Sequence, residues 1–217
     1  MACTIRPYKP EDREAVRRIC CDTGFMGNPI DPLFADRELF ADFLTVYYTD
    51  YEPESALVAI DPENGQVVGY LLSCLRYRYN TFRTLQILLT RVIPLGIFRY
   101  LTFQYNKETR RYLYWLIFKG ARQTPKALPR AAHYHINLLQ KYRTGPDVRG
   151  LMFRFWRESK ERGARAIYGQ MVITDDKRTH FFRRYGFHVL DKKRITKFDR
   201  YQGEKVYLAT LYKVFDA

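Results

Sequence analysis

The chain has 217 residues, a formal net charge of +14 and four cysteines, and 16% of its residues are aromatic. This length suits a single domain, which we expect to span residues 1–217. The adjacent Cys20 and Cys21 fit neither a zinc-binding spacing nor a disulfide framework, and the first 21 residues carry no apolar leader, so we expect a cytoplasmic protein without a metal site.

The N-terminal third predicts strands and helices in alternation. A short strand at residues 4–8 precedes a helix that Pro10 opens and Gly24 ends. A second helix follows, and then a β-hairpin with strands at residues 55–60 and 66–75. This order is typical of an α/β domain.

Three carboxylates, Asp50, Glu52 and Glu54, lie between the second helix and the hairpin. Two interpretations of this acidic segment stay open. The carboxylates would either bind a cationic substrate or form a solvated loop.

The segment from residue 77 to residue 130 is the most individual part of the chain. Residues 76–130 hold 12 basic residues and a single acidic one, Glu108, whereas residues 1–75 hold 13 acidic and 6 basic residues. Such a contrast concentrates anionic partners at the basic part. Blocks of apolar and aromatic residues alternate with the cations, so uncharged runs reach only seven residues, far short of the roughly twenty that cross a bilayer.

We therefore expect this segment to form helices that do not span a membrane. Its function has three interpretations: extra helices that cover the domain, a lid over a hydrophobic acceptor site, or a peripheral contact with a membrane.

The pattern after the insert is strand, tight loop, helix, strand. Residues 133–139 alternate like a half-buried strand, and residues 141–147 turn the chain into a helix that ends near Gly163. A second strand is predicted at residues 166–173. Because a strand that leads into a helix N-terminus presents backbone amides to an anion, the loop is a candidate phosphate site.

The C-terminal part completes the pattern. A short helix at residues 178–187 is closed by Gly186, and a final hairpin has predicted strands at residues 195–198 and 205–214.

The order of these elements resembles the GNAT superfamily of acetyl-CoA-dependent N-acyltransferases. Residues 5–12 resemble its first strand and helix start, residues 67–72 its third strand, and residues 181–187 its terminal Phe-Tyr-x-x-x-Gly-Phe motif. The resemblance implies an α/β fold with a mixed, mostly antiparallel central sheet and helices on both faces. The helical insertion would lie between the third and fourth strands.

The resemblance also implies a function. The chain would transfer an acyl group, normally acetyl from acetyl-CoA, to a small-molecule or peptide amine, with no metal. The resemblance leaves open whether the chain forms a homodimer. Nucleic acid is disfavoured as a partner because the chain has no RRM, OB or helix-turn-helix signature. The alternative is a catalytically impaired GNAT-fold module that holds an anionic membrane or nucleic-acid surface through its basic insert.

For the cofactor, the resemblance implies a site where the two parallel strands diverge. A backbone N–H near Leu138 or Leu139 would hold the thioester carbonyl. The other candidates that would contact acetyl-CoA are Arg143, Thr144, Gly145, Asp147, Val148, Arg149 and Phe182.

Three departures from the family pattern concern this site. Pro146 and Val148 stand where the family has small residues, and Pro146 lacks an amide donor. Phe182 stands where the family has the tyrosine that protonates the leaving thiolate, and a phenyl ring has no proton to give.

The candidate catalytic residues are His135, Asn137 and Tyr185. His135 titrates in the range needed to take a proton from an attacking amine. Asn137 shares its face of the strand by alternation, and Tyr185 is the candidate replacement for the missing acid. All three would also suit ordinary packing positions.

Overall fold

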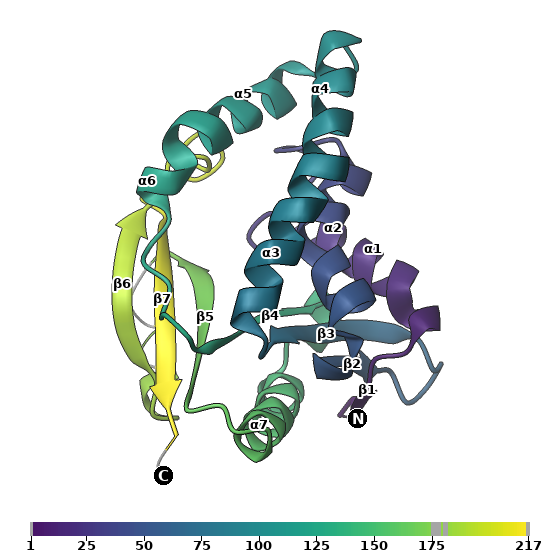
Figure 1. Cartoon of the computed structure of the whole chain (residues 1–217), viewed down its shortest axis with the longest axis vertical. Helices are drawn as coiled ribbons and strands as arrows, with labels where there is room; N and C mark the ends of the chain where they lie inside the picture. Colours follow the sequence, from purple (N-terminus) through teal and green to yellow (C-terminus); the bar gives the residue numbers. More distant parts are fainter. Residues whose placement is uncertain (1, 175–178, 180–181, 216–217) are drawn as a thin grey trace.

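The computed structural model describes residues 2–174, 179 and 182–215. These described residues form a seven-stranded sheet in the order β1-β2-β3-β4-β5-β7-β6, with helices on both faces (Figure 1). The strands are β1 (Thr4–Pro7), β2 (Ala56–Ile60), β3 (Val67–Cys74), β4 (Ala132–Leu138), β5 (Ala166–Ile173), β6 (His188–Arg194) and β7 (Tyr207–Val214). The helices are α1 (Arg13–Thr23), α2 (Arg37–Val46), α3 (Tyr77–Ile87), α4 (Ile93–Leu101), α5 (Lys107–Trp115), α6 (Ala121–Gln123) and α7 (Gly145–Glu161).

The centre of the sheet is its least paired part. Among the described residues, β4 and β5 form the single parallel pair, and it has only three paired positions, the last joining Tyr134 to Gly169. Beyond that point β4 stays paired with β3 and β5 stays paired with β7, so the sheet divides into two halves. In Figure 1, β5, β7 and β6 run at a steep angle to the strands of the other half.

Gly169 marks the position at which the strands part. The Tyr134 ring lies across it, and a Cβ at residue 169 would be 2.6 Å from the nearest ring atom. A side chain larger than hydrogen would therefore collide with the aromatic ring. The tyrosine itself is buried and packs on Phe155 of α7, with ring centroids 5.1 Å apart.

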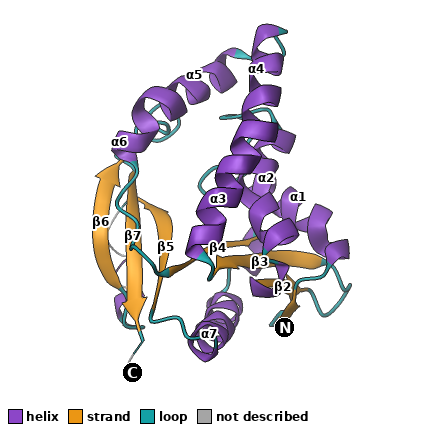
Figure 2. Cartoon of the chain, viewed as in Figure 1, coloured by secondary structure: helices purple, strands orange, loops and turns teal. Residues whose placement is uncertain are grey.

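Two cores hold the layers together. On one face, Val58 and Tyr70 pack with residues of α1 and α2, such as Ile19. On the other face, Leu71 packs with Leu151 and other residues of α7. Figure 2 shows α7 on one side of the sheet and α1, α2 and α3 on the other, which agrees with strict alternation along β2 and β3.

The insert between β3 and β4 is helical. α3 and α4 continue through a π-helical turn, Leu88–Val92, into a single helix, and α5 continues through a second one, Leu116–Gly120, into α6. The two helices form an arch over one face of the sheet, and α6 lies close to β7 (Figure 1).

The first of these helices, Tyr77–Leu101, is long and apolar enough to cross a bilayer by length and composition alone. Its best 18-residue window has a mean hydropathy of 1.2, and 6% of that window is buried. This differs from the expectation based on short uncharged runs, because isolated cations within a long helix lower its mean hydropathy only modestly.

Buried carboxylates on α2 and at its N-terminus anchor the first helix of the arch. Asp36 accepts hydrogen bonds from Arg99 at 2.5 Å and from the Tyr105 hydroxyl at 2.7 Å, and it also caps α2 through the Leu39 amide. Asp42, which is fully buried, pairs with Arg91 at 2.5 Å. The inner face of this helix is therefore an integral part of the domain.

The second helix of the arch is attached to the other half of the sheet. The Gln123 side chain accepts hydrogen bonds from the Trp115 indole and from the Thr196 amide, both at 2.8 Å. The ammonium group of Lys197 lies over the Trp115 ring, 5.0 Å from its centroid. The arch thus connects the two halves of the divided sheet on the side opposite α7.

The predicted C-terminal hairpin was half right. Its second strand agrees with β7, but the strand predicted at residues 195–198 is wrong, because the partner of β7 is β6. The apolar pattern there has another cause: Ile195 and Phe198 are buried in an irregular segment, each 1% exposed. β6 ends in three basic residues and alternates between exposed and half-buried positions, as edge strands often do.

We expect Asp36→Ala to lower the free energy of unfolding by about 3 kcal/mol, because Arg99 and Tyr105 would lose a buried partner. Glu38→Ala is the matched control, since Glu38 is the exposed partner of the same arginine. We expect it to cost less than about 1 kcal/mol. Urea-induced unfolding measures both values, and equal losses would contradict this assignment.

Candidate active site

The gap between β4 and β5 exposes backbone hydrogen-bonding groups. The Leu139 amide donates to the Val68 carbonyl of β3 at 2.9 Å, so the odd-numbered residues of β4 bond toward β3. By alternation, the amides of Ile136 and Leu138 point toward β5, which has already diverged. Of the two amides predicted to bond the thioester carbonyl, the Leu138 amide is therefore the one that points toward the gap.

The N-terminus of α7 lies directly after β4, with the 3₁₀ turn Gln140–Tyr142 between them. Thr144 caps the helix, and its side chain accepts from the Asp147 amide. Within the described residues, the amides of Thr144 and Gly145 donate no hydrogen bond. These two amides are the donors that remain for an anion after Pro146 has removed one.

Asp147 is turned away from this open side. Its carboxylate is buried and accepts hydrogen bonds from the Cys3 amide at 2.7 Å and the Thr144 hydroxyl at 2.6 Å. Burial acts to raise the pKa of Asp147, but these bonds hold it below its ordinary value. The negative charge that the sequence places beside the candidate phosphate site is thus withdrawn into the domain.

The two arginines of the loop differ in their surroundings. Arg143 donates to the Leu138 carbonyl at 2.8 Å and to the Gly27 carbonyl, so its guanidinium joins β4 to the loop after α1. Arg149 is exposed, and its guanidinium lies 3.6 Å from the position that a Cβ on Gly145 would occupy. It has no carboxylate partner in the part of the chain that the structure describes. Arg149 is therefore the cation nearest the available amides.

A narrow groove continues from this loop along α7. It is lined by Val148, Arg149, Met152, Phe153, Trp156, Phe182 and Tyr185. The structure thus brings together four residues that the sequence assigned to the site. The predicted helix at residues 178–187 lies partly outside the described residues, which include Phe182 and Tyr185 but not 175–178 or 180–181.

The two aromatic residues from the C-terminal motif have different surroundings in the groove. Phe182 contacts the Phe187 ring edge-on, 5.7 Å between centroids. Tyr185 packs near Trp156 at 6.4 Å, and its carbonyl accepts from Lys213 at 2.6 Å. Tyr185 therefore lines the same groove as Phe182, on the α7 side of the sheet.

A second cluster lies on the opposite face of β4. The Tyr48 hydroxyl is hydrogen-bonded to Nε2 of His133 at 2.7 Å, and the Tyr48 ring contacts His135 edge-on at 5.3 Å. The Tyr168 ring of β5 lies beside the His133 ring, with 5.6 Å between their centroids. This cluster therefore joins both strands of the gap on the side that the arch covers.

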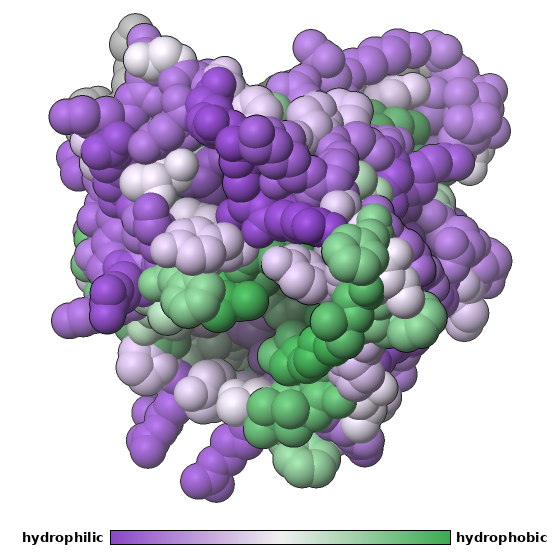
Figure 3. Space-filling model, turned by 90° about the horizontal axis from the view of Figure 1, so that it is seen from above, coloured by the Kyte–Doolittle hydropathy of each residue, from purple (hydrophilic) through white to green (hydrophobic). Residues whose placement is uncertain are grey.

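His135 is exposed at the surface, yet it is surrounded by enough protein to lower its pKa to about 4. Figure 3, which looks down from the end where α4 and α5 meet, shows a central hollow with apolar surface around it. Burial, together with the neighbouring His135, lowers the pKa of His133 to about 3. Both imidazoles are therefore neutral at pH 7, and the lowered pKa makes His135 a weaker base than the sequence predicted.

Asn137 lies deeper on the same face. Its side-chain amide donates to the Tyr70 hydroxyl at 2.7 Å, and Tyr70 is buried. Asn137 therefore has a structural role, since its side chain links β4 to β3. The sequence analysis did not single out Tyr48 and Tyr168. Alternation along the strand at residues 166–173 could have placed Tyr168 beside His133.

The acidic segment before β2 is solvated only in part. Glu52 is 1% exposed and accepts hydrogen bonds from Tyr47, Ser55 and the Leu75 amide. Asp50 and Glu54 are exposed, and they pair with Arg13 and Arg76. The solvated-loop interpretation therefore holds for Asp50 and Glu54 and is wrong for Glu52.

Comparison with family models and with curated proteins finds no match to this chain. Solved structures do match. SsHAT is 27% identical over 100% of both chains, with a TM-score of 0.64. A GNAT superfamily phosphinothricin acetyltransferase from Sinorhizobium meliloti, in complex with AcCoA, is 14% identical over 99% of this chain and 89% of that one, with a TM-score of 0.56. A ribosomal-protein-alanine N-acetyltransferase from Brucella melitensis is 18% identical over 98% and 99%, with a TM-score of 0.55.

The chain shares its fold with N-acetyltransferases of the GNAT superfamily. The predicted fold class is confirmed: the sheet is mixed and mostly antiparallel, and helices cover both faces.

The pKa of His133 predicts how stability depends on pH. Below about pH 6.5 the unfolded chain binds a proton at His133, whereas the folded chain does not until about pH 3. The free energy of unfolding should therefore fall as the pH drops from 6.5 toward 4, by up to about 1.4 kcal/mol per pH unit from this group.

Urea unfolding of His133→Gln at several pH values tests this expectation, because the amide oxygen of the glutamine can still accept a hydrogen bond from the Tyr48 hydroxyl. The difference in stability between wild type and this variant should shrink or reverse as the pH falls. His188→Gln, at an exposed position on β6, should follow the wild type. Parallel curves for all three proteins would show that His133 titrates normally when folded.

Proposed function

We propose that this protein is an acyl-CoA-dependent N-acyltransferase that transfers acetyl from acetyl-CoA to an amine in the cytoplasm. The observation that carries the proposal is the parting of β4 and β5 directly beside the N-terminus of α7. Unpaired strand amides can bond an extended pantetheine arm, and a helix N-terminus attracts a pyrophosphate.

The two faces of β4 divide the roles. On the α7 side, the amides of Thr144 and Gly145 together with Arg149 suit the pyrophosphate, and the apolar groove suits the uncharged part of the donor. On the other side, His135 is exposed on the face that the arch covers, where the acceptor amine would approach. Donor and acceptor would then meet at the gap between the strands.

The reaction needs two proton movements. The amine nitrogen attacks the thioester carbonyl, the carbon–nitrogen bond forms and the carbon–sulfur bond breaks with the electron pair on sulfur. Neutral His135 accepts the proton that the nitrogen loses, and the Leu138 amide stabilises charge on the carbonyl oxygen. Since Phe182 cannot protonate the thiolate, Tyr185 in the same groove or solvent supplies that proton.

Binding of the donor is the first test. Acetyl-CoA at about one hundred times its dissociation constant should stabilise the fold by about 2.7 kcal/mol, which is visible as a rise in melting temperature of a few degrees. Arg149→Glu should weaken acetyl-CoA binding by about tenfold or more, because it places a negative charge beside the pyrophosphate.

Arg157→Glu is the matched control for this charge reversal. Arg157 is exposed two turns further along α7, and its only ion pair in the described chain is a loose one with Glu161 at 3.9 Å. The affinity of Arg157→Glu for acetyl-CoA should stay close to that of the wild type. If both variants lose affinity equally, the nucleotide does not sit at the start of α7.

Proton abstraction is the second test, measured as thiol release from acetyl-CoA with a panel of amines. His135→Gln should lower kcat by about a hundredfold with little change in acetyl-CoA affinity. His188→Gln should leave kcat unchanged. If acetyl-CoA binds but no amine is acetylated by the wild type or by Phe182→Tyr, the chain is a binding module rather than an enzyme.

A further inference from the structure

Exposed apolar side chains concentrate on the arch. Among the residues that the structure describes, 18 large hydrophobic side chains are exposed, and 14 of them belong to the arch. They are Tyr77, Phe82, Leu85, Leu89, Ile93, Ile97, Phe98, Tyr100, Leu101, Phe103, Tyr114, Leu116, Ile117 and Phe118. Figure 3 shows apolar surface gathered on this side of the molecule. Apolar patches of this extent are rare on a protein that meets only water.

The arch tip, which we define as residues 97–106, holds the most exposed part of this surface. Phe103 is 80% exposed and Leu101 is 68% exposed, with Phe98 at 59%. Phe103 also adopts a left-handed backbone conformation, with φ of 59°, which bulky residues rarely take. The fold therefore keeps a large aromatic side chain in solvent at a position that glycine or asparagine would fill with less strain.

Arg110 packs on the tip, and further cations lie along the insert. The guanidinium of Arg110 lies 5.3 Å from the Tyr100 ring centroid and 5.6 Å from that of Phe103. Eight of the 12 cations at residues 76–130 have no carboxylate partner within the described residues. They are Arg78, Arg83, Lys107, Arg110, Lys119, Arg122, Lys126 and Arg130.

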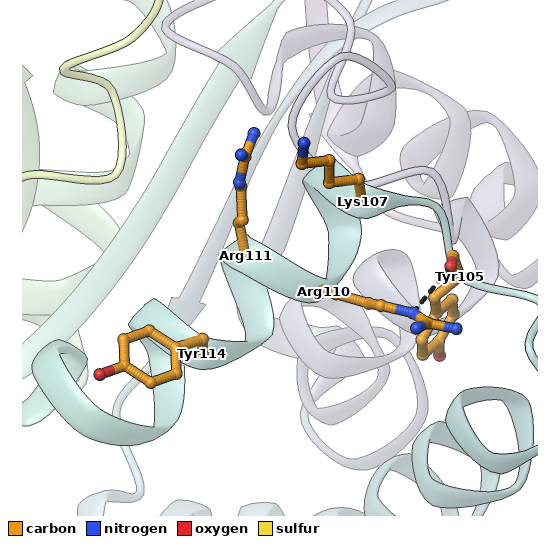
Figure 4. Close-up of a pocket in the computed structure, with 5 residues that line it drawn as sticks. All are labelled: Tyr105, Lys107, Arg110, Arg111 and Tyr114. Atoms are coloured by element: carbon orange, nitrogen blue, oxygen red, sulfur yellow. Dashed lines mark hydrogen bonds between the residues drawn. The ribbon is translucent and has the colours of Figure 1, made fainter.

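A cavity of about 410 Å³ opens beside the tip, at the start of α5 (Figure 4). It is lined by Tyr105, Lys107, Arg110, Arg111 and Tyr114. Figure 4 shows Lys107 and Arg111 pointing to the same side of the helix, while Arg110 reaches back and donates to the Tyr105 carbonyl at 3.1 Å. Arg111 is paired with Glu108 at 2.5 Å, whereas Lys107 and Arg110 have no carboxylate partner among the described residues and suit the phosphate of an anionic headgroup.

We propose that the arch tip docks this protein on an anionic membrane surface. Phe98, Leu101 and Phe103 enter the interfacial layer, and the cavity formed by Lys107, Arg110 and Arg111 holds lipid phosphate. Apolar side chains with cations beside them are complementary to such a surface, because the two groups meet the acyl chains and the negative headgroups together. Aliphatic side chains at the tip do not suit nucleic acid, which binds through stacking and phosphate contacts.

The contact is peripheral rather than spanning. The helix Tyr77–Leu101 has the composition to cross a bilayer, but Asp42 and Asp36 hold its inner face through Arg91 and Arg99. Crossing would break both pairs and leave the buried Asp36 carboxylate without a cation, whereas Asp42 would keep its pair with Arg17. The tip alone can reach the interface while the domain stays folded.

Co-sedimentation of the full chain with vesicles tests the proposal. We expect binding to vesicles of phosphatidylcholine with phosphatidylserine, and much weaker binding to phosphatidylcholine alone. The double variant Leu101→Ser/Phe103→Ser should lower the affinity by about tenfold or more. Because this variant keeps all of the charge, attraction of a basic protein to an acidic surface cannot explain such a loss.

The matched control is Leu190→Ser/Val214→Ser, which removes two exposed apolar side chains, 38% and 58% exposed, from outside the arch. It should bind vesicles like the wild type. Lys107→Glu/Arg110→Glu should abolish the preference for phosphatidylserine, with circular dichroism confirming that the fold is retained. No acyl transfer enters these measurements, so the membrane proposal and the proposed enzyme stand or fall separately.

Four results would overturn the proposal. The first is equal binding by wild type and Leu101→Ser/Phe103→Ser, and the second is complete displacement from vesicles by a soluble polyanion such as a short RNA. The third is retention in membranes after alkaline carbonate washing, which would indicate a spanning helix. The fourth is self-association that the same double variant abolishes, which would make the tip a contact between copies of the chain.

Discussion

The early divergence of β4 from β5 organises the molecule. After three paired positions, β4 continues with β3 and β5 continues with β7, so strand amides in the middle of a sheet are left without strand partners. Buried strand amides need partners. On one side of this gap lies the N-terminus of α7, and on the other lies the cluster of Tyr48, His133 and His135. A ligand that supplies hydrogen bonds at the gap would complete the sheet.

A divided sheet needs another connection between its halves, and the arch supplies one. Buried Asp36 and Asp42 hold the first helix of the arch on α2, and Gln123 holds the second near β6 and β7. The same segment carries most of the large apolar side chains that are exposed among the described residues. The insert therefore combines a structural role with an exposed apolar surface.

The sequence predicted the parts of the fold that depend on local pattern and not those that depend on distant partners. β5 and α7 follow from periodicity and from the Gly145-Pro146 start of the helix, and β5 has the predicted boundaries. β6 was missed because its polar alternation resembles a loop. Glu52 looked solvated because no local signal shows that Tyr47, Ser55 and Leu75 would converge on it from three segments.

The two proposed surfaces are compatible because the fold separates them. The proposed donor site lies beside α7 on one face of the sheet, whereas the arch rises from the other face (Figure 1). A molecule docked by its tip would leave α7 open to the aqueous phase, where acyl-CoA is available. The face of β4 that carries His135 would then lie on the side of the interface, so an amine with an apolar body could pass from the membrane along the exposed side chains of the arch. Donor and acceptor would reach the gap from two different phases.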